Sequence, residues 1–231
     1  MTQTYGQFCP VAMAAEIVCT RWTPLLMREL AGGSTRFNDL RRGLSRMSPA
    51  LLSQRLKDLE AAGVVERKPA PGEPAVSEYH LTPAGRELWP VIFALGEWGQ
   101  RWIETEASLK KLDAQLLMWD MRRHLNPNPM PRKRSVIQFQ YPELPAAQRV
   151  WWLVVTPGED CDLCQVDPGF DVDLYVSSDL RTMTSIWMGY ETVRQASNAR
   201  RLHLTGDNDL AANMQTWLGL SGLAKVERMV G

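Results

Sequence analysis

The stretch "SPALLSQRLKDLEAAGVVERK", residues 48–68, contains the features that decide the fold. A serine followed by proline marks a helix start, because the serine hydroxyl caps free N–H groups and proline fits the first turn. Leu52, Leu56 and Leu59 recur at spacings of four and three residues, which places them on one helix face. Gly63 is typical of a helix end, and the "VVERK" that follows is typical of a strand. The stretch therefore predicts a helix that leads into a strand.

The opposite face of this helix carries small, amide and basic side chains. At about 100° per residue, Ala50, Ser53, Gln54 and Lys57 lie opposite the leucines. Small side chains let a helix enter the major groove of DNA, glutamine can bond a base edge, and lysine can hold a phosphate. The face is consistent with a recognition helix, although an exposed helix face without any partner would have a similar composition.

The segments before and after this helix predict three further helices and two strands in a defined order. Residues 10–19 read as a short helix, and Thr23 is expected to cap a second helix with Pro24 at its first position. "RFNDLRRGL" predicts a third short helix with Phe37 and Leu40 facing inward. After the fourth helix, "VVERKP" and "SEYHLT" read as two strands joined by the loop "APGEPAV". Three short helices, a fourth helix and a hairpin make a winged helix-turn-helix.

Basic charge gathers around the same helices although the whole chain is neutral, with 26 basic and 26 acidic residues. Between residues 21 and 57 the only acids are Glu29 and Asp39. A local positive excess attracts phosphate, but it could also be a solvated surface balanced by acids elsewhere in the fold. The basic residues of this segment are Arg21, Arg28, Arg36, Arg41, Arg42, Arg46, Arg55 and Lys57.

Length and composition bound the remaining possibilities. A chain of 231 residues suits one or two domains, and 45% hydrophobic content is ordinary for a globular protein. No apolar run approaches the ~20 residues of a membrane helix. The N-terminal segment has no basic region followed by an apolar core, so we expect no secretory signal. Four cysteines are few for a disulfide scaffold, which favours a reduced, cytoplasmic protein.

"CPVAMAAEIVCTRWTPLLMRELAGGSTRFNDLRRGLSRMSPALLSQRLKDLEAAGVVERK", with "YHLTPAGREL" after it, resembles the HxlR-type winged-helix transcription regulators. The resemblance covers roughly residues 8–104 and implies a dimeric regulator that binds double-stranded DNA. The sequence departs from a basic wing, because Glu73 and Glu78 stand against Lys68. We therefore expect few wing contacts beyond Arg67 and Lys68. The predicted DNA-binding residues are Arg36, Arg41, Arg42, Ser48, Pro49, Ala50, Ser53, Gln54, Arg55, Lys57, Arg67 and Lys68.

A further helix is expected to start at Thr82-Pro83 and to carry an apolar stripe at three- and four-residue spacing. The first domain is too small to bury the whole stripe, which favours a homodimer through a partner helix, unless the second domain covers it. The stripe consists of Leu88, Val91, Ile92, Leu95, Gly99 and Trp102, widened by Trp89 and Trp98.

The chain beyond this helix predicts a second domain. A helix is expected over residues 108–125, and "NPNPMPRKR" reads as a linker. Ile137, Phe139 and Tyr141 then alternate with polar residues, and "RVWWLVVTP" reads as a strand buried on both faces. Strand "DVDLYVSS", a helix capped by Ser178, a short helix, strand "RLHLTGD" and a last helix follow. The fold class is α+β, with predicted segments 1–106 (winged helix), 107–134 (connector) and 135–231 (second domain).

"VDLYVSSDLRTMTSIWMGY" through "RRLHLTGDNDLAANMQTWL" resembles the sterol carrier protein family over roughly residues 135–220. That resemblance implies an apolar tunnel and an apolar small-molecule effector. The adjacent tryptophans of "RVWWLVV" must point to opposite sheet faces, and methionine and aromatic walls suit apolar pockets. The same residues could simply fill a core. The predicted ligand-binding residues are Trp151, Trp152, Met183, Trp187, Met214 and Trp217.

Two cysteine features are candidate sites. Cys9 matches the N-terminal cysteine of the HxlR-type regulators, which implies a thiol switch, and it precedes Pro10 at a helix N-terminus, where a thiolate is favoured. A buried structural cysteine is the alternative. Cys161 and Cys164 could begin a metal site, but no second pair of ligands stands at a usable spacing, so packing is the simpler interpretation.

Taken together, the sequence predicts a sequence-specific DNA-binding transcriptional regulator that represses its targets. We expect a second domain that binds an apolar effector, no metal, no cofactor and no catalytic residue, because phosphate-loop, nucleophile-elbow and paired His/Glu motifs are missing. The alternative is a redox-sensing regulator switched through Cys9, with a structural second domain. An enzymatic second domain is a further rival that a turnover screen would test.

Overall fold

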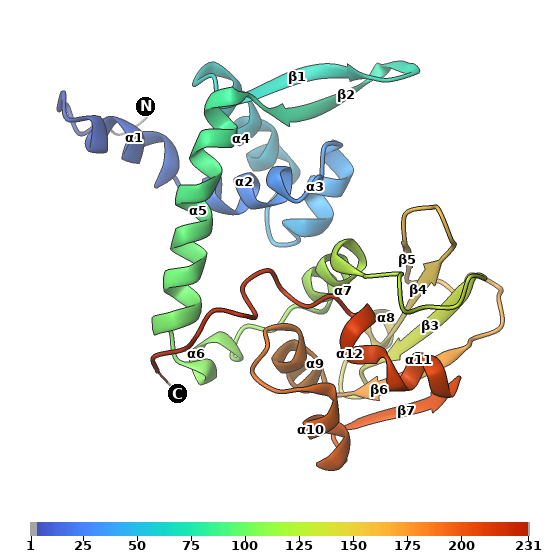
Figure 1. Cartoon of the computed structure of the whole chain (residues 1–231). Helices are drawn as coiled ribbons and strands as arrows, with labels where there is room; N and C mark the ends of the chain where they lie inside the picture. Colours follow the sequence, from blue (N-terminus) through green and yellow to red (C-terminus); the bar gives the residue numbers. More distant parts are fainter. Residues whose placement is uncertain (1–3, 231) are drawn as a thin grey trace. The chain divides into compact units, whose positions relative to one another are not determined.

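A computed structural model describes residues 4–230, and the chain folds into two compact units, Met1–Gly96 and Glu97–Gly231 (Figure 1). The fold class is α+β, as the sequence predicts. Among these described residues, no helix has both the length and the apolar character needed to cross a bilayer. The unit boundary falls within one long helix, whereas the functional segments 1–106, 107–134 and 135–231 stay a prediction.

The first unit is a winged helix-turn-helix. Four helices precede a two-stranded antiparallel hairpin, and a long helix follows it (Figure 1). This long helix contains Pro90 and continues six residues past the unit boundary. The elements are α1 (Pro10–Val18), α2 (Thr23–Ala31), α3 (Phe37–Gly43), α4 (Pro49–Ala61), β1 (Val65–Ala70), β2 (Glu73–Leu81) and α5 (Pro83–Trp102).

Helix α4 has the start, the buried face and the end that its sequence predicts. The Ser48 hydroxyl accepts a hydrogen bond from the Leu51 N–H at 3.3 Å. Leu52, Leu56 and Leu59 are at most 2% exposed and join the core of the unit. The helix ends in a Schellman arrangement, since Gly63 takes a φ of +71° and its N–H donates to the Glu60 carbonyl.

The expected cap of the second helix is wrong by one residue. Trp22, not Thr23, is the N-cap of α2, and its carbonyl accepts the Leu26 N–H at 2.9 Å. Trp22 has a φ of 79°, so the chain makes a left-handed turn directly before the helix. Thr23 becomes the first helical residue and is buried in the core. The Thr-Pro pair cannot reveal this, because the turn at Trp22 depends on packing around it.

The hairpin is longer than predicted. Most of the expected loop "APGEPAV" is strand, because β2 begins at Glu73 and only Pro71 and Gly72 separate it from β1. Gly72 supplies the positive φ of this tight turn. The strand register shifts between Pro69 and Ala70, because Pro69 pairs with Ser77 whereas Ala70 pairs with Glu73. The wing is therefore an extended ribbon with Val65 opposite Leu81 at its base.

One carboxylate is buried in the first unit. The Glu29 side chain on α2 is fully buried and accepts two hydrogen bonds from Arg28, with an ion-pair distance of 2.8 Å. Arg28 also donates to the Gly43 carbonyl at the end of α3. Gly43 leaves room for the carboxylate, since a Cβ there would lie 1.9 Å from Glu29 Oε2. This group joins α2 to α3 inside the helix-turn-helix.

The predicted single helix over residues 108–125 is wrong. The structure has a short α6 (Thr105–Ser108) and a separate α7 (Ala114–His124). The Asp113 side chain caps α7 by accepting from the Leu116 N–H at 3.1 Å, which starts a new helix there. Leu117, Met118 and Met121 pack into the core of the second unit, so α7 belongs to that core rather than to a bare connector.

A five-stranded sheet in the order β5-β4-β3-β6-β7 forms the centre of the second unit. Only the β3–β6 pair is parallel among the described strands. Trp151 and Trp152 point to opposite faces as predicted: Trp151 lies in the main core, and Trp152 joins a small cluster on the other face. The strands are β3 (Ser135–Gln140), β4 (Val150–Val155), β5 (Asp162–Cys164), β6 (Leu174–Ser178) and β7 (Leu202–Gly206).

Short helices contribute the rest of the main core. Asp179, not Ser178, caps α9, because its carboxylate reaches the Thr182 N–H at 2.6 Å. The expected last helix is two helices that meet at Asn213. The helices after α7 are α8 (Ala146–Arg149), α9 (Leu180–Trp187), α10 (Val193–Asn198), α11 (Asn208–Ala212) and α12 (Met214–Trp217).

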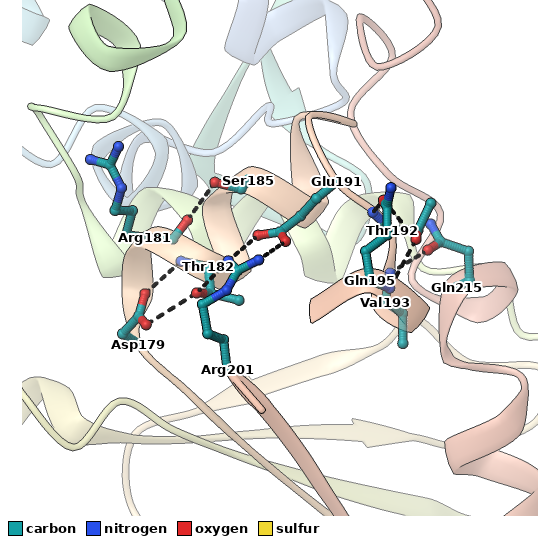
Figure 2. A network of polar contacts seen from close by, with 10 residues as sticks. All are labelled: Asp179, Arg181, Thr182, Ser185, Glu191, Thr192, Val193, Gln195, Arg201 and Gln215. Atoms are coloured by element: carbon teal, nitrogen blue, oxygen red, sulfur yellow. Dashed lines mark hydrogen bonds and ion pairs between the residues drawn. The ribbon is translucent and has the colours of Figure 1, made fainter. Parts of the chain in front are cut away.

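A network of polar contacts fastens these short helices to one another, as Figure 2 shows. The Arg201 guanidinium makes two hydrogen bonds to the Glu191 carboxylate, at 2.8 and 2.5 Å. Thr192 and Gln195 form a capping box at the start of α10. The Val193 N–H donates to the Gln215 side chain at 2.7 Å, which ties α10 to α12. Helices too short to be stable alone are held by these side-chain bonds and by burial.

We expect Gly43→Ala to destabilise the first unit by about 1–3 kcal/mol, because the added methyl group overlaps a buried carboxylate that Arg28 holds in place. Chemical denaturation followed by circular dichroism measures this loss. Gly99→Ala is the matched control, since a Cβ there meets its nearest neighbour at 3.6 Å and alanine favours helix. Equal stability of Gly43→Ala and the unmodified chain would contradict the packing described for Glu29.

Candidate nucleic-acid interface

Helix α4 presents its polar face outward. Ala50, Gln54 and Lys57 are exposed, and Ser53 is half-buried. The three leucines on the opposite face anchor the helix to the core, so these side chains have a fixed position. The predicted orientation of the helix is confirmed, while the DNA contacts of the individual residues stay a prediction.

Asp58 holds two of the candidate side chains. The Gln54 amide donates to Asp58 Oδ1 at 2.8 Å, and Arg55 pairs with Asp58 Oδ2 at 2.6 Å. Arg55 also donates to the main-chain carbonyl of Arg21 at 3.3 Å. Its side chain is only 21% exposed, so Arg55 fastens α4 to the segment before α2 as well as carrying charge.

A groove with a volume of about 820 Å³ lies between α3, α4 and the hairpin. Its position beside a recognition helix and a wing is where a DNA backbone would run. Asp39 and Glu60 stand among its basic residues. Of the predicted DNA-binding residues, it brings together Arg36, Arg42, Ser53, Lys57 and Arg67.

Two of the wing carboxylates, Glu73 and Glu78, bond the same arginine. Arg36 bonds Glu73 at 2.7 Å and Glu78 at 3.4 Å, and these carboxylates raise the pKa of the guanidinium, Glu73 most. Arg36 therefore braces the hairpin against α3. On the wing itself, Lys68 pairs with Glu66 at 2.7 Å, and Arg67 donates to the Ser77 hydroxyl at 2.9 Å. The acidic wing expected from sequence is thus partly neutralised within the unit.

The remaining predicted DNA-binding residues lie at different positions in the unit. Ser48 and Pro49 form the start of α4, and Arg41 is exposed on α3. Arg42 pairs with Asp39 at 2.9 Å. No DNA-binding role was predicted from the sequence for several other groove residues, which include Phe37, Asn38, Ala75, Val76, Ser77 and Tyr79. Alternation along β2 was the available signal only for those that lie on that strand.

Cys9 is the N-cap of α1. The N–H groups of Ala12 and then Val11 lower its pKa, because they stabilise the thiolate at the helix start. The pair Cys161 and Cys164 differs: burial raises the pKa of Cys161 to about 12, and burial also raises that of Cys164. Cys161 packs against the main core and Cys164 against the cluster on the other sheet face.

The candidate effector residues of the second unit pack into hydrophobic clusters. Within the main core, the indole N–H of Trp151 donates to the Gln148 carbonyl, and that of Trp217 donates to the Leu210 carbonyl, both at 2.8 Å. Met183, Trp187 and Met214 lie in the same core, whereas Trp152 lies in the cluster on the other sheet face. Over residues 4–230, the structure has no group of three or more His, Cys, Asp or Glu side chains placed to hold a metal ion.

Comparison with known proteins identifies the first unit. The model of the HxlR-like helix-turn-helix family matches residues 17–107. YvaP of Bacillus subtilis, named an uncharacterized HTH-type transcriptional regulator, is 37% identical over 100 residues, which are 43% of this chain and 93% of YvaP. The chain belongs to the HxlR-like helix-turn-helix family. A second HxlR-like relative, sll1512 of Synechocystis, is 35% identical over 102 residues, 44% of this chain and 76% of that protein.

Solved structures resemble the same part of this HxlR-like chain. The redox regulator HypR in its reduced form is 33% identical, with a TM-score of 0.38, over 40% of this chain and 91% of HypR. The reduced form of the transcriptional regulator YodB from B. subtilis is 31% identical, with a TM-score of 0.36, over 41% of this chain and 93% of YodB. The family match ends at residue 107, so the likeness of residues 135–220 to sterol carrier proteins stays a prediction.

We expect Cys9 to react with iodoacetamide at lower pH than an ordinary thiol, because its lowered pKa leaves more thiolate at a given pH. Cys161, whose pKa is raised to about 12, should stay unmodified in the folded protein near neutral pH. Mass spectrometry of peptides after timed alkylation from pH 6 to 9 measures both rates. Cys9 reacting no faster than the same cysteine in a denatured chain would contradict the effect of the helix N–H groups.

Proposed function

We propose that this HxlR-like chain is a cytoplasmic, homodimeric, sequence-specific DNA-binding transcriptional regulator that represses its target genes. The observation that carries the proposal is the outward polar face of α4, which stands beside a basic groove closed on its other side by the hairpin. The names of the relatives as HTH-type transcriptional regulators support it. No catalytic residue is assigned.

Different side chains on and beside the outward face of α4 would contact the bases and the phosphates. Ala50 and Ser53 are small enough for the helix to approach the base edges. Gln54 would bond a base after it releases Asp58, and Lys57 and Arg42, which line the groove, would hold phosphates. Base contacts then set specificity, while phosphate contacts set general affinity.

Dimerisation is assigned to the exposed stripe of α5. Ile92 is buried in the first unit, but four other apolar side chains of the helix are about half exposed: Val91 58%, Leu95 55%, Trp98 57% and Trp102 47%. At 100° per residue these four fall within a narrow arc of the helix. A second copy packed on this arc would remove a row of apolar surface from water, and a two-fold dimer would read two half-sites.

The second unit is proposed to bind an apolar effector. Its support is a core rich in tryptophan and methionine, with the likeness to sterol carrier proteins. Trp151, Trp187 and Trp217 sit in that core and report on it through their fluorescence. Titration of the full chain with fatty acids, sterols and aromatic hydrocarbons tests the proposal, and no saturable change across this panel would remove it.

A redox-sensing regulator is the second candidate function. The observation that favours it is Cys9, a half-buried thiol with a lowered pKa at the start of α1. Peroxide would then change DNA affinity in the unmodified chain and leave Cys9→Ser unaffected. The second unit would be structural in this case.

Selection of bound fragments from a random DNA pool is the direct experiment on the proposed function. A recurring two-fold motif is expected from a dimer with one recognition helix in each half-site. Recovery of no shared motif, or of no DNA at all, would refute sequence-specific binding.

We expect Gln54→Ala to relax preference at one base pair of each half-site, at a cost of about 1–3 kcal/mol for the preferred base. Lys57→Ala should instead weaken all sequences alike and reduce the slope of log affinity against log salt by about 0.9 per subunit. Fluorescence anisotropy on selected and scrambled DNA at several salt concentrations separates the two. Lys110→Ala, an exposed lysine of the second unit, is the control and should bind normally. An unchanged base preference in Gln54→Ala would contradict the role of α4.

We expect Leu95→Glu to convert the dimer into a monomer, because a charge in the middle of the apolar row loses its hydration when a second copy packs there. Sedimentation velocity measures the change in mass. Val166→Glu is the control, since Val166 is 80% exposed and lies off the helix. A Leu95→Glu chain that still sediments as a dimer would place the interface elsewhere.

A further inference from the structure

A second hollow of the first unit lies apart from α4. It has a volume of about 430 Å³, within the range of about 300–1,000 Å³ typical of small-molecule sites. Its residues come from the end of α2 and the loop after it, from the last part of β2, and from the first turns of α5. They are Leu30, Ala31, Thr35, Tyr79, His80, Leu81, Arg86 and Trp89.

The walls of this pocket are apolar and aromatic. Leu30 is buried, and Leu81, Tyr79 and Trp89 are half-buried and pack against the core of the unit. Trp89 is also held by Phe93, with ring centroids 5.7 Å apart. A planar ring that lies against these walls would bury apolar area with little loss of conformational freedom, whereas a flexible chain would lose more on binding.

One cation stands at the edge of the pocket with donors to spare. Arg86 Nη1 donates to the Leu81 carbonyl at 2.6 Å, which fixes the guanidinium beside the pocket. A guanidinium has five N–H donors, so most of them stay available for an acceptor. Planar carboxylates match this fork in two parallel hydrogen bonds.

The neighbouring charges do not remove this positive character. His80 lies 3.3 Å from Glu78, whose carboxylate also pairs with Arg36. Glu66 lies opposite His80 in the hairpin and is bonded to Lys68 at 2.7 Å, and the charges of His80 and Arg86 also help to lower the pKa of its carboxyl. Each of these carboxylates has a closer cation than Arg86, whose one hydrogen bond among the described residues goes to the Leu81 carbonyl, so its other N–H groups can take a ligand acceptor.

We propose that this pocket binds a small aromatic carboxylate, with its ring against Trp89 and Leu81 and its carboxylate on Arg86. The site belongs to the first unit and is separate from the effector site proposed for the second. Its wall is shared with the DNA-facing groove, because Tyr79 lines both hollows.

Tyr79 connects the pocket to the brace of the wing. Its N–H donates to the Thr35 carbonyl at 2.8 Å, and the residue after Thr35, Arg36, bridges to Glu78. A ligand that shifts Tyr79 or Thr35 therefore moves the position from which Arg36 holds the hairpin. On this argument, which rests on the proposed function, the bound acid lowers DNA affinity, and DNA lowers affinity for the acid by the same factor.

Benzoate is the probe, titrated by calorimetry into the full chain without DNA. Saturable binding is expected, with benzamide, which lacks the charge, and cyclohexanecarboxylate, which lacks the aromatic ring, each weaker by about tenfold. Arg86→Gln should weaken benzoate at least about tenfold. Its matched control is Arg101→Gln, an exposed arginine later on the same helix, which should bind benzoate normally.

Ala31→Phe provides a second variant that leaves Arg86 intact. Phenylalanine at this exposed end of α2 fills the pocket and should abolish benzoate binding, while Ala107→Phe on α6 should not. Circular dichroism verifies that each variant is folded. The proposed site would be overturned if benzoate did not bind the unmodified chain saturably. It would also be overturned if Arg86→Gln and Ala31→Phe both bound benzoate as tightly as the unmodified chain does.

DNA titrations with and without saturating benzoate test the coupling. A DNA dissociation constant raised at least about threefold in the unmodified chain, and unchanged in Arg86→Gln, supports it. If benzoate leaves the DNA dissociation constant of the unmodified chain unchanged, the coupling is overturned, but the proposal that the pocket binds benzoate is not. If the chain selects no DNA, the proposed function fails, and the calorimetric titrations still decide whether the pocket binds its acid.

Discussion

The buried carboxylate of Glu29 is the constraint on which the DNA-facing part of the molecule depends. It lies inside the helix-turn-helix, held by Arg28, and it occupies space that only a glycine at position 43 leaves free. A charge without water must keep its partners, so the geometry of α2, the turn and the end of α3 is fixed together. Helix α4 packs on this arrangement through its leucines, and the groove beside it takes its shape from α3.

Features encoded by neighbouring residues were predictable. The Ser48-Pro49 start, the leucine face and Gly63 define α4 through interactions within a few residues, and the structure has them as predicted. The cap at Trp22 was not predictable in this way, because it depends on a left-handed turn at a residue that is not glycine. The break before Asp113 does have a local signal, since aspartate is a preferred helix cap and its side chain accepts the Leu116 N–H, but the apolar spacing on either side of it favoured one continuous helix. Burial of α7 in the core of the second unit, in contrast, depends on contacts with distant strands.

Some features of the candidate site could likewise be predicted from local sequence, and others could not. Which side chains face outward on α4 follows from helical geometry and one buried stripe. The pairs that Gln54 and Arg55 make with Asp58 follow from the same geometry. The distant partners do not, since Arg36 before α3 meets Glu78 across 42 residues and Arg55 reaches a carbonyl 34 residues away. The pocket beside Trp89 was likewise hidden, because its walls come from three elements that no motif connects. Trp151 and Trp152 show the reverse case, where strand alternation alone placed them on opposite faces.

If α4 recognises bases as proposed, the hydrogen bond between Gln54 and Asp58 affects how the helix distinguishes one base sequence from another. In the free protein the amide already has an acceptor, so contact with DNA is an exchange of bonds rather than a simple gain. A base that offers both an acceptor and a donor in the major groove compensates the lost bond. A base that does not would leave the amide bonded to Asp58, without the contact that the correct base gains. The bond to Asp58 would thus widen the difference in affinity between a base that replaces it and a base that does not.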